Sequence, residues 1–511
     1  MSAIALRTPS HRSWRRASLA MTALIVVAAC SVSMPSATEP DPTAVATLNP
    51  TATPVPASTT GPVPTPTVDP ATGATPTAIT IPPTVTPVPT PQPDGPCGVG
   101  PLALPDPNRP VYDVALDIDP ASRTVEGTMT VDFGPDLPVD ELVFRLWPNG
   151  PRPTAGGVDL QLTRVELPTG PVEPELLLPT LALVPLPQTL QPGERITAQV
   201  DFTLTVPTEL RSRLSGRDDY MRLGTIIPLL PWEPGIGWAS DPATSLFAEA
   251  VLSPVADWTV AIDVPDDFDV LASGVRDDDG VWRVESARDF AISVGRFRTV
   301  TATAFAPEPV QVIVGVHETI DDDEQAYLDK VVDSLEQFSA RFGQYPWPSL
   351  TFALTPNLRG GIEFPTHIMQ GQNTIGRTTS HEVGHMFFYS LVGNNQGAHP
   401  WLDEGITSYA EFTYEGTAPG AYAIAANGIG EAAQPMTFWE SRPDAYYSSV
   451  YSQTGFALQL LGDRDDVDCA LARFVADNAH AIARPMDFVQ AFEPTFPGIV
   501  DDLAQLGVNL N

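Results

Sequence analysis

Two histidines four residues apart enclose a glutamate in the run His381-Glu382-Val383-Gly384-His385, and the apolar residues 386–388 continue it. On an α-helix, residues four apart lie on one face, about 6 Å apart along the axis, so both imidazoles can bind one metal ion. Glu382 lies about 100° around the same helix and can face a water molecule on that ion. The run therefore predicts a helix that carries two metal ligands and a carboxylate base, with Thr379 and Ser380 as candidate N-caps.

A catalytic zinc site needs a third protein ligand and one open position. Glu404 provides a carboxylate, with 18 residues between it and His385. We therefore predict one Zn²⁺ bound by His381, His385 and Glu404, with Glu382 as the catalytic base. Because the chain has only 7 His, chance matches to the histidine motif are expected on the order of 0.005 times. A solvated or core-capping histidine pair is the alternative.

Glu411 follows Glu404 by seven residues on the same predicted helix face. It is a candidate for orienting a zinc-bound imidazole, and a surface carboxylate is the alternative. His399 lies in the predicted connecting loop beside Pro400 and is interpreted as structural, and the remaining histidines of the predicted folded region have no ligand-like spacing to the motif; they are His317, His367 and His480.

Residues 1–30 have the pattern of an export signal. Four arginines precede an uncharged, mostly apolar run from Ala17 to Cys30, which is shorter than the roughly 20 apolar residues of a membrane span. Small residues lead directly into Cys30, and this arrangement resembles the bacterial lipoprotein signal. The resemblance implies that Cys30 is lipidated and that a lipid anchor holds the protein to a membrane of the bacterial cell envelope. An ordinary secretory signal cut nearby is the alternative.

Residues 31–96 are unsuited to folding. They contain 18 Pro and 16 Thr and no Lys or Arg, so they cannot bury enough apolar area to offset the entropy of ordering. In polyproline form, at about 3.1 Å per residue, such a segment reaches at most roughly 200 Å. We expect a disordered tether between the lipid anchor and a folded body.

Charge and cysteine content bound the remaining possibilities. The formal charge is −35, from 27 basic and 62 acidic residues, which argues against nucleic acid as a partner because phosphate binding needs a basic surface. Beyond Cys30 the chain has two cysteines, Cys97 and Cys469. An exported chain can keep a disulfide, but no spacing rule tests a single distant pair. Pairing and two separate thiols both stay open.

The folded body divides into two predicted domains, 97–308 and 309–511. The first contains short alternating runs such as 111–118 and 128–133, which are typical of β-strands, and the acidic run 277–280 suits a tight turn. In the second, apolar residues recur every three or four positions from Leu328 to Phe342 and indicate an amphipathic helix that ends at Gly343. A strand is expected at 350–354, followed mainly by helices. The fold class is therefore multidomain α+β.

These motifs together resemble one family, the gluzincin zinc metallopeptidases of the membrane alanyl aminopeptidase and leukotriene hydrolase group. Gly360-Gly361-Ile362-Glu363-Phe364 is similar to its Gly-x-Met-Glu-Asn segment, which runs beside the substrate and whose glutamate binds a free N-terminal amine. The run 446–451 is similar to the region that carries its transition-state tyrosine. The resemblance implies a saddle-like N-terminal β domain, a thermolysin-like catalytic domain and peptide substrates. It also implies substrate binding by Gly360, Gly361 and Glu363, and catalysis assisted by Tyr451.

The chain departs from the family pattern at three places. Phe364 replaces the usual Asn and Ile362 the usual Met, and three residues separate Tyr451 from Gly455 where the family usually has two. Tyr447 is therefore a second candidate for the tyrosine. The chain ends at Asn511 without a large helical C-terminal domain, so we expect a more open cleft.

Three functions agree with these patterns. Glu363 favours an aminopeptidase that trims peptides outside the cytoplasm, while the open cleft and Phe364 favour an endopeptidase. A surface binding protein stapled by zinc is the third hypothesis. The retained Glu382 counts against it, because a purely structural zinc site needs no base.

Overall fold

The structure is a computed structural model that describes residues 95–208, 210–246, 252–418 and 430–510. All of them belong to one compact unit, Pro87–Asn511. The predicted export signal, the lipidation site Cys30 and the predicted tether up to residue 94 lie outside the described residues. Within the described residues, no helix is both long enough and apolar enough to cross a membrane.

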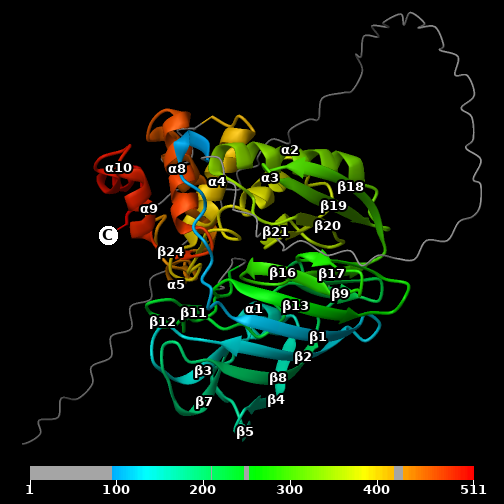
Figure 1. Cartoon of the computed structure of the whole chain (residues 1–511). Helices are drawn as coiled ribbons and strands as arrows, with labels where there is room; N and C mark the ends of the chain where they lie inside the picture. Colours follow the sequence, from blue (N-terminus) through cyan, green and yellow to red (C-terminus); the bar gives the residue numbers. More distant parts are fainter. Residues whose placement is uncertain (1–94, 209, 247–251, 419–429, 511) are drawn as a thin grey trace, which may run out of the picture. The chain divides into compact units, whose positions relative to one another are not determined.

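An eight-stranded sheet forms much of the N-terminal half (Figure 1). Its central strand alternates strictly between exposed and buried side chains, as the sequence predicted for 111–118. This strand pairs antiparallel with the next strand along the chain and parallel with a distant one. In spatial order the strands are β15 (Val275–Arg276), β16 (Trp282–Ala287), β13 (Ala256–Asp263), β1 (Val111–Asp119), β2 (Thr124–Phe133), β8 (Ile196–Thr205), β4 (Asp159–Leu167) and β5 (Gly170–Pro171).

Three smaller sheets complete this half. A three-stranded sheet has the order β3 (Val139–Arg145), β7 (Leu181–Leu190) and β6 (Glu175–Leu178). A four-stranded sheet has the order β14 (Asp269–Ala272), β17 (Ile292–Gly295), β10 (Tyr220–Leu223) and β9 (Leu214–Arg217). A two-stranded sheet pairs β11 (Trp232–Glu233) with β12 (Gly237–Trp238). Short helices also occur here: η1 (Pro96–Gly98), η2 (Trp147–Asn149) and α1 (Pro151–Ala155).

The predicted acidic turn is confirmed. The Gly280 amide donates to the Asp277 carbonyl at 3.0 Å, and the Asp277 carboxylate accepts from the Asp279 and Val281 amides. The turn joins β15 to β16. Residues 270–272 precede this turn in the sequence but belong to β14, in a different sheet.

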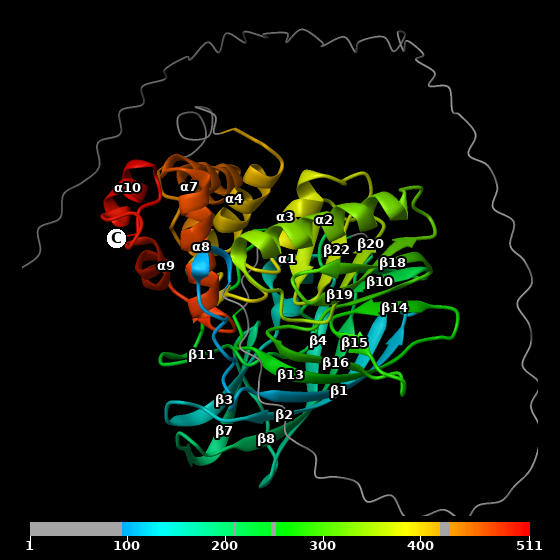
Figure 2. The ribbon, with the colours of Figure 1, turned by 45° about the horizontal axis from the view of Figure 1, so that its top comes forward.

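A five-stranded sheet carries the predicted catalytic half. Its order is β18 (Phe297–Phe305), β19 (Pro309–His317), β20 (Ser349–Leu354), β22 (His367–Gln370) and β21 (Gly361–Phe364). The β18–β19 hairpin crosses the predicted boundary at residue 308. Helices α2 (Glu324–Phe342) and α3 (Arg377–Gly384) pack on this sheet, as both ribbon views show (Figures 1 and 2). Because β21 is the last strand in the order, one of its edges has no strand partner within the sheet.

Helix α2 confirms the sequence prediction. The side chain of its N-cap, Asp323, accepts a hydrogen bond from the Gln325 amide, and Gly343 follows the last residue. The predicted apolar stripe is largely buried: Leu328, Val331, Leu335, Phe338 and Phe342 are at most 2% exposed, and Val332 is half-buried against them.

The remaining elements are mostly helical. They are β23 (Gly393–Asn394), η3 (Pro400–Leu402), α4 (Glu404–Tyr414), α5 (Met436–Trp439), α6 (Pro443–Tyr446), η5 (Tyr447–Gln453), α7 (Thr454–Leu460), α8 (Arg464–Asn478), β24 (Ile482–Ala483), α9 (Pro485–Phe492) and α10 (Ile499–Gln505). Cys97 and Cys469 form a disulfide with their Cα atoms 5.6 Å apart. The bridge ties η1, near the start of the described chain, to α8.

Replacing both cysteines by serine is expected to lower the free energy of unfolding by about 2–5 kcal/mol, because the bridge joins residues 372 apart and restricts the unfolded chain. Urea unfolding of wild type and variant measures the difference. Dithiothreitol is expected to destabilise wild type by a similar amount and to leave the serine variant unchanged. Equal stabilities of wild type and variant would show that the bridge contributes little.

Candidate metal and catalytic site

Helix α3 presents the histidine motif, but its bounds differ from the prediction. It begins at Arg377 after the N-cap Gly376, so Thr379 and Ser380 lie inside the helix rather than at its cap. It ends at Gly384, with His385 as the C-cap. The predicted helical continuation through 386–388 is wrong: residues 386 and 387 form a turn, Phe388 forms an isolated β-bridge with Val392, and the side chains of 386–388 pack in the core. This early end matters because it allows the Phe388 carbonyl to accept a hydrogen bond from Nδ1 of His385, at 3.1 Å.

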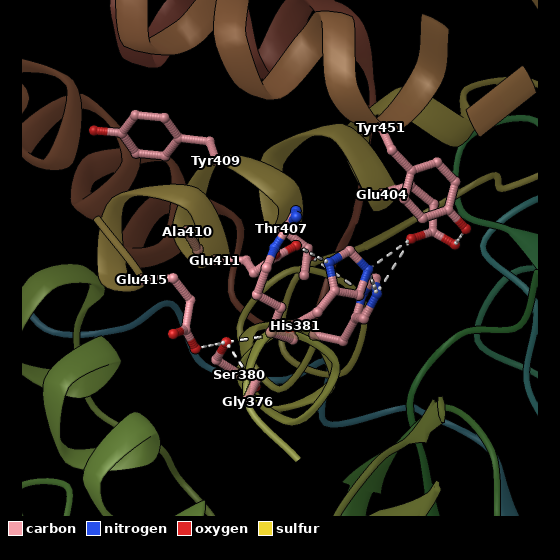
Figure 3. Close-up of polar contacts among 12 residues, drawn as sticks. Gly376, Ser380, His381, Glu404, Thr407, Tyr409, Ala410, Glu411, Glu415 and Tyr451 are labelled. Carbon is pink, nitrogen blue, oxygen red and sulfur yellow. Dashed lines mark hydrogen bonds and ion pairs between the residues drawn. The ribbon is translucent and has the colours of Figure 1, made fainter. Parts of the chain in front are cut away.

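Three predicted ligands meet where α3 faces the start of α4 (Figure 3). Nε2 of His381 lies 3.1 Å from Nε2 of His385, and these two atoms lie 3.2 and 3.3 Å from Oε2 of Glu404. Donors bound to a tetrahedral zinc ion at about 2.0–2.1 Å are separated from one another by about 3.3–3.4 Å. The three atoms therefore match one face of a zinc coordination tetrahedron in chemistry and in spacing.

The opposite nitrogen of each imidazole faces an acidic group. Nδ1 of His381 lies 3.3 Å from the Glu411 carboxylate, the contact that the sequence suggested. Nδ1 of His385 lies 2.7 Å from the carboxylate of Asp403, which is 1% exposed. Acceptors on this side favour a proton on Nδ1, which leaves the Nε2 lone pair for a metal.

The electrostatics of the cluster favour a bound cation. Burial alone would lower the pKa of His381, but hydrogen bonding to Glu404 and Glu411 outweighs it and raises the pKa to about 10. Burial would raise the pKa of Glu404, but the two imidazoles hold it well below its usual range. The buried carboxylates therefore need positive charge beside them, supplied by protons or by a metal ion.

Glu382 is buried beside these ligands and is suited to be a base. It is 5% exposed, and its Oε2 has no hydrogen-bond partner in the part of the chain that the structure describes. Burial raises its pKa to about 7. A Cβ on Gly361 would lie only 2.4 Å from Cγ of Glu382, so glycine at this position makes room for the carboxylate.

Glu363 points into the same space from β21. It is 4% exposed, and its Oε1 has no hydrogen-bond partner among the residues that the structure describes. One potential ligand atom each of Glu363, Glu382 and His385 lie within 4.8 Å of one another. Burial raises its pKa to about 8. The departure at Phe364 does not disturb this arrangement, because that ring is fully buried and packs against the Arg213 guanidinium, 5.4 Å from the ring centre.

Tyr451 reaches the ligands despite its altered spacing. Its hydroxyl donates to Oε1 of Glu404, and its ring stacks on His381 with centroids 5.7 Å apart. The segment η5 is a π-helix, which holds an extra residue per turn and so accommodates the one-residue difference from the family pattern. Tyr447, the second candidate, also lines the pocket but is 52% exposed.

A cavity of about 940 Å³ opens onto this group. The predicted substrate residues Gly360, Gly361 and Glu363 line it together with the metal ligands, Glu382 and Tyr451. Residues from the β-rich half complete its wall, among them Trp147 and Arg213. The structure therefore brings together all the predicted site residues within the described part of the chain.

Two features of the site were missed at the sequence level. Asp403 immediately precedes a ligand, but adjacency gave no reason to expect it against the other side of His385. Arg213 belongs to the β-rich half, and its place over Trp147, at 4.5 Å, depends on tertiary packing. The sequence offered one signal for Asp403, namely that it is acidic and adjacent to a predicted ligand. It offered no signal that would have placed Arg213 in the site.

Solved zinc metallopeptidases share this fold. A mutant M1 zinc metallopeptidase from Deinococcus radiodurans, bound to a Tyr-Ser-Ala substrate, is 17% identical over 78% of this chain and 94% of its own, with a TM-score of 0.58. A second structure of a mutant M1 zinc metallopeptidase from the same organism is 18% identical over 79% of this chain and 95% of its own, with a TM-score of 0.56. A two-domain M1 zinc metallopeptidase mutant bound to L-arginine is 16% identical over 78% of this chain and 94% of its own, with a TM-score of 0.56. No protein-family model matches the chain.

These likenesses establish the fold: a large β-rich N-terminal region followed by a helical part, as in the M1 peptidase structures. The predicted multidomain α+β class agrees with it.

Zinc is expected to stabilise the metal-free protein. At a free concentration about 1,000 times the dissociation constant, the expected gain is about 4 kcal/mol, which thermal unfolding detects as a rise in Tm. The Glu404→Gln variant should lose most of the rise because one of three ligands is weakened. The Glu382→Gln variant should keep it, since that residue is outside the ligand set. A full rise in Glu404→Gln would contradict the assignment.

The Asp403→Ala variant is expected to bind zinc about 10–100-fold more weakly, because the His385 imidazole loses the carboxylate beside Nδ1. Competition with a chromogenic chelator measures the dissociation constant. Glu415→Gln is the matched control: this carboxylate accepts a hydrogen bond from Ser380 of α3 but faces no imidazole. Unchanged affinity in Asp403→Ala, with circular dichroism like that of wild type, would exclude this role.

Proposed function

We propose that this protein hydrolyses peptide bonds with zinc and acts as an aminopeptidase. The observation that carries the proposal is the triangle of two Nε2 atoms and one carboxylate oxygen, 3.1–3.3 Å apart. Beside it lies the buried Glu382, whose Oε2 has no hydrogen-bond partner among the described residues. The fold shared with M1 zinc metallopeptidases supports it.

His381, His385 and Glu404 would hold the zinc ion. When bound, the ion supplies a Lewis acid that polarises a peptide carbonyl and lowers the pKa of a water molecule to about 7. Glu382 accepts a proton from the attacking water and later gives a proton to the leaving amine. Its raised pKa of about 7 places it close to neutral pH, where a group can perform both transfers.

Tyr451 supplies a hydroxyl at the same place. The Tyr451 hydroxyl donates to Glu404 in this structure. When the O–H bond turns toward the cavity, the same hydroxyl donates to the oxyanion that develops on the carbonyl oxygen. The loss of one such donor costs about 2.7–4 kcal/mol of transition-state stabilisation in other enzymes.

Glu363 and β21 favour cleavage at a free N-terminus. The open edge of β21 lets a peptide add as a further strand, with Gly360 and Gly361 offering no side chain in its way. At the end of such a strand, the carboxylate of Glu363, whose Oε1 has no hydrogen-bond partner among the described residues, binds a protonated amine. The Tyr-Ser-Ala peptide and L-arginine bound to the M1 structures are ligands with such an amine.

Several finer expectations also belong to the proposal. The β-rich half is saddle-like, and the helical half is thermolysin-like. The protein is exported, and a lipid on Cys30 anchors it to a membrane of the bacterial cell envelope. Peptides are its substrates there, and the tether separates the folded body from the membrane.

Matched peptides with free and acetylated N-termini test the proposal. Zinc-loaded wild type is expected to cleave only the free peptides, because the acetylated amine carries no charge for Glu363 to bind. Removal of the zinc ion by a chelator is expected to abolish the activity. Glu382→Gln should lower kcat by about 10²–10⁴, whereas Glu318→Gln, an exposed carboxylate in the loop after β19, serves as the unaffected control. Kinetic assays by chromatography measure each rate.

Two outcomes would contradict the proposal. Equal cleavage of free and acetylated peptides would indicate an endopeptidase and remove the role of Glu363. Zinc binding without cleavage of any peptide in a broad library would instead support the zinc-stapled binding protein.

A further inference from the structure

The Glu411 carboxylate on α4 touches two partners at once. Its Oε2 lies 3.3 Å from Nδ1 of the predicted metal ligand His381 (Figure 3). Its other oxygen, Oε1, accepts a hydrogen bond from Nε of Arg377. A line of contacts therefore runs from a guanidinium, through one buried carboxylate, to an imidazole whose far nitrogen faces the predicted zinc position. A turn of the carboxylate away from this orientation breaks both contacts.

Arg377 occupies a position where the helix itself disfavours a cation. It is the first residue of α3, and the N-cap before it, Gly376, provides no side-chain hydrogen bond. The helix dipole places partial positive charge at this end, so an acidic side chain would stabilise the helix and a basic one does not. The reason for an arginine here therefore lies in its tertiary contacts.

The Arg377 guanidinium contacts α4 twice. Besides its ion pair with Glu411, its central carbon lies 5.3 Å from the ring centre of Phe412, the next residue along the helix, which is buried. The arginine side chain is nevertheless 60% exposed and lines the cavity. An ion pair with so exposed a partner adds little to the stability of the fold. Its main effect is to fix the direction of the Glu411 carboxylate.

The second histidine of the motif has a parallel support of different charge. Nδ1 of His385 lies 2.7 Å from one oxygen of Asp403, and the other oxygen accepts a hydrogen bond from the Gln396 amide at 2.5 Å. Gln396 and Asp403 are both fully enclosed, at 1% exposure each. A neutral amide thus holds the carboxylate behind one imidazole. On the cavity side, Arg377 occupies the equivalent place behind the other.

We propose that Arg377 is a positioning residue of the metal site. It holds Glu411 toward Nδ1 of His381, and this fixes the tautomer and the direction of the imidazole whose Nε2 binds zinc. The role rests on the proposed function, of which it concerns the zinc ion and not the choice of peptide.

Charge and position predict opposite effects of removing this arginine. A guanidinium near the site repels a divalent cation, so an effect of charge alone would make Arg377→Gln bind zinc more tightly. Loss of positioning instead lets the Glu411 carboxylate turn away, and zinc binding weakens. Arg359→Gln is the matched control for charge: this arginine is also exposed and lines the cavity, but the ion pair with Glu411 belongs to Arg377.

Competition with a chromogenic chelator measures the zinc Kd of each variant. We expect Kd to be about tenfold higher for Arg377→Gln than for wild type, and at least as high for Glu411→Ala. Adding Arg377→Gln to Glu411→Ala should not raise Kd further, because the arginine acts through the carboxylate. Arg359→Gln should bind zinc as tightly as wild type or more tightly. The visible absorption bands of the Co²⁺-substituted protein, which report the ligand geometry, should change in Arg377→Gln and stay unchanged in Arg359→Gln.

The outcomes separate this role from the proposed function. If wild type and variants show these differences in Kd but no peptide is cleaved, the positioning role stands and the proposed function fails. If wild type cleaves peptides while Arg377→Gln, with circular dichroism like that of wild type, keeps the wild-type Kd and Co²⁺ bands, the positioning role is wrong. It is equally wrong if Arg377→Gln weakens zinc binding by the same factor with and without Glu411.

Discussion

The close approach of α3 and α4 is the constraint on which the site depends. It brings two imidazole nitrogens and a carboxylate oxygen within 3.1–3.3 Å of one another. Gly384, inside the histidine motif, makes the approach possible, because a Cβ there would lie 3.0 Å from Cγ2 of Thr407 on α4. Burying two imidazole lone pairs and a carboxylate side by side costs free energy of folding unless a cation binds between them. The packing of α3 against α4 thus places negative charge where a bound metal ion would neutralise it.

Local sequence rules predicted the parts of the fold that depend on local interactions. Helix α2 has the apolar stripe and the terminating Gly343 that the sequence predicted, and both are readable from neighbouring residues. The two histidines on α3 were predictable because helical geometry fixes the spacing of His381 and His385. Glu404 was predicted separately, from the need of a catalytic zinc site for a third protein ligand. The alternation of β1 predicted a strand with one buried face.

The features that escaped prediction depend on long-range packing. The end of α3 at Gly384 goes with contacts that lie outside the helix, because Nδ1 of His385 meets the Phe388 carbonyl and the Asp403 carboxylate. The cavity wall also joins Arg213 of the β-rich half to Glu363, 150 residues later in the sequence, and nothing in the local sequence near Arg213 indicates this proximity. Whether Cys97 and Cys469 pair was also open, because proximity of residues 372 apart is a property of the whole fold.

The disulfide also decides where mechanical load enters the folded body. Cys97 is the point at which the chain from the N-terminal side meets the described fold, and its sulfur is bonded to Cys469 of α8. A pull on the preceding chain is transmitted through that bond into a helix whose residues pack against α2 and α9. Strand β1, which follows 14 residues after Cys97 in the sequence, is shielded from this force. Tension on the preceding chain would therefore reach α8 through the disulfide before it reaches the central sheet.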